Sequence, residues 1–169
     1  MDQEKTTEAL DRDGFAVFER CVPEALLCVF EKEVGEFSSA SGRRIGVEGN
    51  GDAGLLGVFR RGGNFRSICY QMIQGLPALR QIGNHLAESA EIGALLRHYQ
   101  FELPALSQSM RVDIPDEADF LLPPHQDYAG MRSHKALRFW LPLRDADGPS
   151  GTMAVYPGTH QAGVLDHSA

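Results

Sequence analysis

His125 and Asp127 stand two positions apart in the stretch PPHQDYAG, a spacing that suits metal binding. Side chains at positions i and i+2 of an extended segment point to the same face, so the imidazole and the carboxylate converge while Gln126 points away. A neutral nitrogen and a hard oxygen suit Fe(II), Mn(II) or Zn(II), and two histidines with one carboxylate form the ligand set of many non-heme Fe(II) sites. The same residues also fit a solvated loop in which Asp127 caps a turn. The pair therefore predicts either a metal site or a polar turn.

A second candidate is the glycine run GNGDAG, residues 49–54, which matches the G-x-G-x-x-G pattern of dinucleotide sites. Such a site needs a buried strand directly before the glycines and a helix that opens on them, so that backbone N–H groups meet the pyrophosphate. The preceding residues read SGRRIGVE, and no βαβ unit opens the chain. The run therefore favours a flexible loop over a nucleotide site.

Length and charge restrict the class of protein and its partners. The 169 residues, 43% of them hydrophobic, suit a single folded domain over residues 1–169. A formal net charge of −7, with no Lys/Arg block longer than a pair, argues against nucleic acid as a partner. No apolar stretch approaches the roughly 20 residues that cross a bilayer, and the acidic start MDQEKTTEALDRDG does not resemble a signal peptide. We therefore expect a cytoplasmic protein that binds neither nucleic acid nor a membrane.

The first hundred residues are expected to be mostly helical. We predict a short helix over residues 6–11, a strand over 14–22, and an amphipathic helix that begins at Pro23. The glycine-rich residues 38–63 predict a long loop or two loosely formed strands. Two or three helical pieces should follow, with breaks at residues 75–77 and near Gly83.

From residue 103 onward the pattern is that of strands. In residues 106–114, every second side chain from Leu106 through Gln108 to Ile114 shares one face, and two more strands are expected within residues 135–160. Helices followed by strands predict the α+β class, with helices packed on an antiparallel sheet. The three cysteines form no CxxC pair, so we expect buried thiols and neither a disulfide framework nor a zinc site.

Several features in a fixed order resemble the phytanoyl-CoA dioxygenase-like family of Fe(II)/2-oxoglutarate-dependent oxygenases. In that family an H-x-D pair precedes a strand with a W-x-P-L-like core, an acidic turn, a glycine-containing entry to the next strand and a PGSH-like ending. The corresponding stretches here are HQD at 125–127, WLPL at 140–143, DAD at 145–147, GTM at 151–153 and PGTH at 157–160. The opening residues 11–34 are also similar to the family's DGF strand and helix. The resemblance therefore extends over nearly the whole chain.

This resemblance implies a double-stranded β-helix, which is a cupin-like jelly-roll barrel, with helices packed outside it. Fe(II) would bind His125 and Asp127 at the mouth of the barrel, and 2-oxoglutarate would be the co-substrate in the hydroxylation of a small molecule. Tyr128 is expected to face that substrate.

Three further residues are candidates for binding the 2-oxoglutarate co-substrate. Trp140 lies on the strand after the metal pair, and Gln108 and Arg111 lie on the strand before it. Each also has a purely structural interpretation, because a lone tryptophan in a strand commonly belongs to the core. Gln108 and Arg111 also suit an outward-facing surface.

The sequence departs from the family pattern after the H-x-D pair. The family's third ligand is a histidine well downstream, followed about ten residues later by an arginine that binds 2-oxoglutarate. Of the later histidines, His134 lies in a turn too close to the pair, His160 falls on the structural PGTH position, and His167 lies in the segment after it. About four strands are expected where a jelly roll has about eight, so we expect a barrel shortened at its C-terminal end or completed by another chain. Open sheet edges would then favour self-association.

Two other functions stay open at this point. One is a non-catalytic binding or assembly module that keeps the fold elements without a competent iron site. The other is a cupin-like metal enzyme that does not use 2-oxoglutarate. The primary substrate is not encoded in any pattern of the sequence, because loop residues choose it and one fold serves many substrates.

Overall fold

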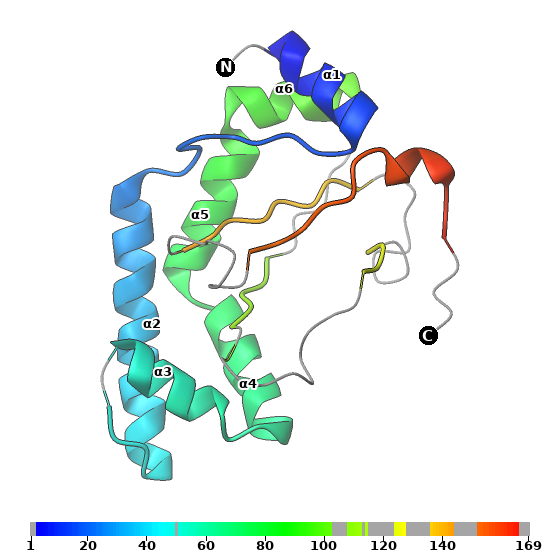
Figure 1. Ribbon diagram of the computed structural model, residues 1–169. Coiled ribbons are helices and arrows are strands. Elements are labelled where there is room, and N and C mark those ends of the chain that lie inside the picture. Colours follow the sequence, from blue (N-terminus) through cyan, green and yellow to red (C-terminus); the bar gives the residue numbers. More distant parts are fainter. Residues whose placement is uncertain are drawn as a thin grey trace.

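The computed structural model describes residues 3–49, 51–102, 108–112, 114, 124–127, 136–143 and 152–165. Within these ranges the regular elements are helices (Figure 1): α1 Gln3–Asp13, α2 Glu24–Ile45, α3 Gly51–Phe59, α4 Gly63–Gln74, α5 Pro77–Glu88, α6 Ala90–His98 and the 3-10 helix η3 Thr159–Ala162. The helical half of the predicted α+β class is thereby confirmed. No β-strand forms within the described residues, so the barrel remains a prediction.

The strand predicted over residues 14–22 is wrong, because these residues form an irregular connection between α1 and α2. The described parts of the strands predicted over 106–114 and 135–160 are extended but are not assigned as strands. In the view of Figure 1, residues 136–143 (orange) and 152–157 (red) run in opposite directions past α5.

The helix boundaries follow local signals in most places. The helix predicted over residues 6–11 is confirmed within α1, and α2 begins at Glu24, directly after Pro23. The predicted break at residues 75–77 separates α4 from α5. The break predicted near Gly83 is wrong: the helix continues to Glu88, and α6 begins after Ser89, whose hydroxyl accepts a hydrogen bond from Ile92 N at 3.1 Å.

The loop predicted over residues 38–63 is also wrong. Helix α2 continues to Ile45, where Gly46 ends it in the left-handed conformation at φ 70°, and α3 covers Gly51–Phe59. The glycines here permit close contact instead of marking a loop. A Cβ on Gly42 would lie 2.9 Å from the Val47 carbonyl oxygen, and a Cβ on Gly54 would lie 2.6 Å from the Gly49 carbonyl oxygen. The G-x-G-x-x-G run therefore belongs to a tight helix–helix corner, with a helix before it in place of the strand that a nucleotide site needs.

The core joins the apolar faces of α2 to α5. Its most buried side chains include Phe30 of α2, Phe59 of α3, Ile73 of α4 and Ala78 of α5, each at most 1% exposed. The rings of Phe59 and Tyr70 meet edge to face, with centroids 4.8 Å apart. Burial of these aromatic and branched side chains is the main source of stability for the helical part.

Two buried or half-buried charges complete this core at helix ends. The guanidinium of Arg66, only 6% exposed, donates from Nε to the Phe59 carbonyl oxygen at 2.7 Å, at the C-terminal end of α3. The Glu33 carboxylate accepts a hydrogen bond from Ala78 N at 2.9 Å, in the first turn of α5. Both charges have the sign that the helix dipole favours at that end.

Only one of the three cysteines fits the expectation of buried thiols. Cys69 is buried, and burial raises the pKa of its thiol, whereas Cys21 is half-buried and Cys28 is exposed on α2. The prediction is therefore wrong for Cys28. The buried positions of α2, such as Phe30 and Val34, recur with a helical spacing that does not include Cys28, so this thiol lies on the outer side of the helix.

The extended segment at residues 108–112, with Ile114, is fixed onto the helices. Met110 and Val112 pack against the core and Ile114 is 7% exposed, so the predicted shared face is confirmed for these residues, and it lies on the core. The Tyr70 hydroxyl of α4 accepts from Val112 N and donates to Val112 O, both at 3.2 Å. This single side chain therefore takes both backbone groups of Val112, as a neighbouring strand would.

The turn at residues 158–161 is attached to the C-terminal end of α1. Gly158 N donates to Asp13 O at 2.9 Å, and His160 Nε2 and Gln161 Nε2 lie 3.1 and 3.0 Å from Asp11 O. Tyr99, at the end of α6, donates to the Asp11 carboxylate at 2.7 Å, and partial burial with this hydrogen bond raises the pKa of Tyr99 to about 12. The turn and α6 thus hold the end of α1 from two sides.

No helix within the described ranges is long and apolar enough to span a membrane.

Candidate metal site

The His125 and Asp127 side chains converge as their spacing predicts. His125 Nε2 lies 3.3 Å from Asp127 Oδ1, and the two side chains are 39% and 36% exposed. Two ligand atoms that each lie about 2.1 Å from one metal ion at right angles are about 3.0 Å apart. The observed nitrogen and oxygen are close to that separation, so they fit two adjacent positions around a single cation.

Arg138 joins this pair from a separate segment. Its Nε lies 2.5 Å from Asp127 Oδ2, and its side chain is 56% exposed. The two oxygens of the Asp127 carboxylate therefore have different partners: Oδ1 meets His125 and Oδ2 meets Arg138. Sequence reasoning missed Arg138. The available signal was its position two residues before Trp140, which places both on one side of an extended segment.

Gln126 points away from its two neighbours, as predicted, and binds another segment. Its Nε2 donates to Gly163 O at 2.9 Å, and its Oε1 accepts from Leu165 N at 2.8 Å. The donor and the acceptor of one side-chain amide therefore both bind the backbone of residues 163–165. The residue between the two candidate ligands thus connects them to the segment that follows η3.

We expect Gln126→Ala to loosen this connection without unfolding the helices. One hydrogen bond contributes about 1 kcal/mol net, so hydrogen exchange of the Leu165 amide should accelerate by about fivefold, because that amide loses its acceptor. Exchange measured by NMR or mass spectrometry tests this. Amides of α5 serve as the internal control, and unchanged exchange at Leu165 would contradict the contact.

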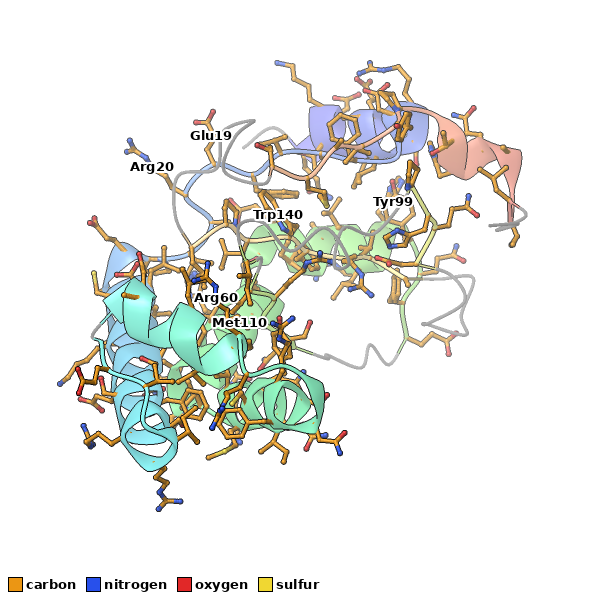
Figure 2. The ribbon with its side chains drawn as sticks, turned by 60° about the horizontal axis from the view of Figure 1, so that its bottom comes forward. Glu19, Arg20, Arg60, Tyr99, Met110 and Trp140 are labelled. Atoms are coloured by element: carbon orange, nitrogen blue, oxygen red, sulfur yellow. The ribbon has the colours of Figure 1, made fainter. Side chains whose placement is uncertain are left out.

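The other predicted site residues lie as follows. Gln108 packs its amide against α5, because a Cβ on Gly83 would meet Gln108 Nε2. Arg111 is exposed, and Trp140 is 47% exposed, so Trp140 does not belong to the core. In the view of Figure 2, Met110 lies toward α3 and α4, and Trp140 lies between them and α1. Tyr128 lies outside the described residues, and the co-substrate roles of Trp140, Gln108 and Arg111 remain predictions.

A third ligand is not found in the part of the chain that the structure describes. No group of three His, Cys, Asp or Glu side chains that could hold a metal ion occurs there. His160 directs Nε2 at the Asp11 carbonyl oxygen, which agrees with the structural role expected of the PGTH turn. His134 and His167 fall outside the described residues. Within the described residues the candidate site therefore offers two donors that would suit one cation, with Arg138 on the second carboxylate oxygen of Asp127.

Comparison with known proteins agrees with these features. A family model described as phytanoyl-CoA dioxygenase (PhyH) matches residues 10–169, which include the His125 and Asp127 pair. The rat protein named phytanoyl-CoA dioxygenase domain-containing protein 1 is 24% identical over an alignment of 185 positions, which covers 90% of this chain and 63% of that protein. The chain thus spans somewhat less than two thirds of this relative. No solved structure matches the chain. With the match over residues 10–169 and the paired histidine and aspartate inside it, the chain belongs to the phytanoyl-CoA dioxygenase family.

Proposed function

We propose that this protein is an Fe(II)/2-oxoglutarate-dependent dioxygenase that hydroxylates a small molecule, with His125 and Asp127 as ligands of the iron. The carrying observation is the 3.3 Å approach of His125 Nε2 to Asp127 Oδ1 in a chain of this family. A nitrogen and a carboxylate oxygen are the donor types that a non-heme Fe(II) site uses. When bound, iron and 2-oxoglutarate activate O2, so that one oxygen atom ends in the hydroxylated product and the other in succinate, with loss of CO2.

The protein's own residues bind and orient the reacting groups and exclude water. His125 and Asp127 offer their donors from one short segment, and Gln126 anchors that segment to residues 163–165. In the proposed site, the Arg111 guanidinium pairs with a carboxylate of 2-oxoglutarate, since its planar donors match a carboxylate. Trp140 supplies an apolar wall that keeps water away.

Two residues have a more limited place in the proposal. Gln108 is proposed to contribute to the 2-oxoglutarate pocket from the position where its amide lies against Gly83 of α5. Tyr128 is proposed to face the substrate, as its position directly after Asp127 suggests. Replacement of Tyr128 should therefore change substrate preference more than metal affinity.

The same proposal includes a jelly-roll barrel built from the extended segments. Its support is the alternation of residues 140–143, where Leu141 and Leu143 pack against the helical core while Trp140 and Pro142 are exposed. Alternation of this kind is expected of a strand with one face on a helical layer and the other on a site. The helices would then form the outer cover of the barrel.

The direct test is turnover of 2-oxoglutarate by the protein supplied with Fe(II), ascorbate and O2. We expect succinate and CO2 in equal amounts, and neither product above background after the metal has been removed with a chelator. Even without the primary substrate, slow uncoupled turnover should be measurable. Succinate that does not exceed the metal-free control would reject the proposal.

A non-catalytic binding module is the second candidate, because the described residues supply two metal donors and no third. It predicts a folded protein that binds no Fe(II) and releases no CO2 from 2-oxoglutarate. The cupin-like alternative predicts metal binding that is indifferent to N-oxalylglycine, an analogue of the co-substrate. Titration of Fe(II) with and without this analogue separates the three functions.

A further inference from the structure

The two oxygens of the Asp127 carboxylate are held in unequal surroundings. Oδ1 lies 3.3 Å from His125 Nε2, on the side where the proposed ion would bind, and Oδ2 lies 2.5 Å from Arg138 Nε. A carboxylate can bind a metal ion through one oxygen or through both. The arginine occupies the second oxygen, so the geometry leaves one oxygen for a cation.

Arg138 is held where it can exert this control. It lies in residues 136–143, and Leu141 and Leu143 of the same segment pack against the helical core. The backbone that carries the guanidinium is therefore fixed by apolar contacts, while the guanidinium itself stays 56% exposed. An ion pair this exposed contributes little to folding stability, because water screens it. Its main effect is then on the orientation of Asp127.

Resting on the proposed function, we infer that Arg138 is a positioning residue that makes Asp127 a one-oxygen ligand of the metal. The guanidinium fixes the plane of the carboxylate through Oδ2 and turns Oδ1 toward His125. Its positive charge also repels a cation, so orientation and repulsion act in opposite directions. Residues that hydrogen-bond to metal ligands usually strengthen metal binding by about 10- to 100-fold. The orienting effect of Arg138 should therefore exceed its repulsion of the cation.

The test uses Co(II), whose visible absorption weakens as its coordination number rises. We expect Arg138→Met to weaken Co(II) binding by about 10- to 100-fold and to reduce absorption per bound ion, because the freed Oδ2 also binds. Arg138→Lys should recover part of the affinity, since the ammonium restores a donor on Oδ2. Arg80→Met, at an exposed arginine of α5, is the matched control and should bind as the wild type does.

Three results distinguish this inference from the proposed function. If the wild type binds no Co(II), the proposed metal site fails and the inference fails with it. If the wild type binds and Arg138→Met binds equally well or more tightly with an unchanged spectrum, only the inference is overturned. In the metal-free protein, the Arg138 Nε–H resonance should move upfield in Asp127→Asn, and an unchanged resonance would also overturn it. Melting temperatures measured alongside show that each variant is folded.

Discussion

His125→Ala and Asp127→Ala are each expected to abolish Fe(II)-dependent succinate formation and to weaken Co(II) binding by more than about 100-fold. Loss of an outer partner alone costs about 10- to 100-fold, and loss of a donor atom itself exceeds that range. With one of the two donors removed, the remaining side chain offers a single contact from a partly exposed position. Isothermal titration with Co(II) and a succinate assay with Fe(II) measure the two effects independently.

These substitutions should leave the fold intact, because both side chains are more than one third exposed and lie outside the helical core. We expect melting temperatures within a few degrees of the wild type. His98→Ala is the matched control, since this histidine is exposed on α6 and its ring meets Tyr99 edge to face. Undiminished Co(II) binding by both site variants would remove the pair from the metal site.

The second large effect is expected at Gly54, where a single methyl group has no space. A Cβ there would lie 2.6 Å from the Gly49 carbonyl oxygen and 3.1 Å from the Gly49 carbonyl carbon, both backbone atoms that cannot rotate away. Overpacking in a tight contact usually costs 1 to 3 kcal/mol, so we expect Gly54→Ala to lower the free energy of unfolding by about 2 to 3 kcal/mol. Urea denaturation followed by circular dichroism measures this change.

Gly35 supplies the matched control on α2. Nothing lies within 4 Å of a Cβ at this position, so alanine gains helix propensity with no clash. We expect Gly35→Ala to raise the free energy of unfolding by about 0.5 to 1 kcal/mol. Equal effects of the two substitutions would show that the corner between α2 and α3 is not closely packed.

Helix α2 and the glycines at its corner with α3 also show where sequence reasoning succeeds and where it fails. The apolar positions Phe30 and Val34 recur with helical spacing and form the buried face of α2. The same reasoning ended that helix too early, because a glycine reads alike in a loop and at a close contact. The difference depends on contacts between α2 and α3, such as Gly42 with Val58 and Gly54 with Ser38, which form only after α3 has folded back on α2.

The candidate site divides in the same way. The convergence of His125 with Asp127 depends on neighbours along the chain, so alternation in an extended segment was sufficient to predict it. The contact of Arg138 with Asp127 joins two segments: the local pattern places Arg138 on the same side as Trp140 but does not show that this side meets Asp127. That Met110, Val112 and Ile114 share one face was predictable from alternation, but the hydrogen bonds of Tyr70 to Val112 were not.

The attachment of residues 158–161 to the end of α1 has a consequence for how the chain folds. The bonds from His160 and Gln161 to Asp11 close a loop of about 150 residues, so α1 leaves the ribosome long before its partners do. The entropic cost of loop closure grows slowly with loop length, by about 0.6 kcal/mol per doubling. A loop of this length therefore adds little to the free-energy cost of folding. The delay is kinetic, since contacts of such high sequence separation form late. During synthesis, the carbonyl groups at the end of α1 are therefore hydrated until residue 161 has left the ribosome.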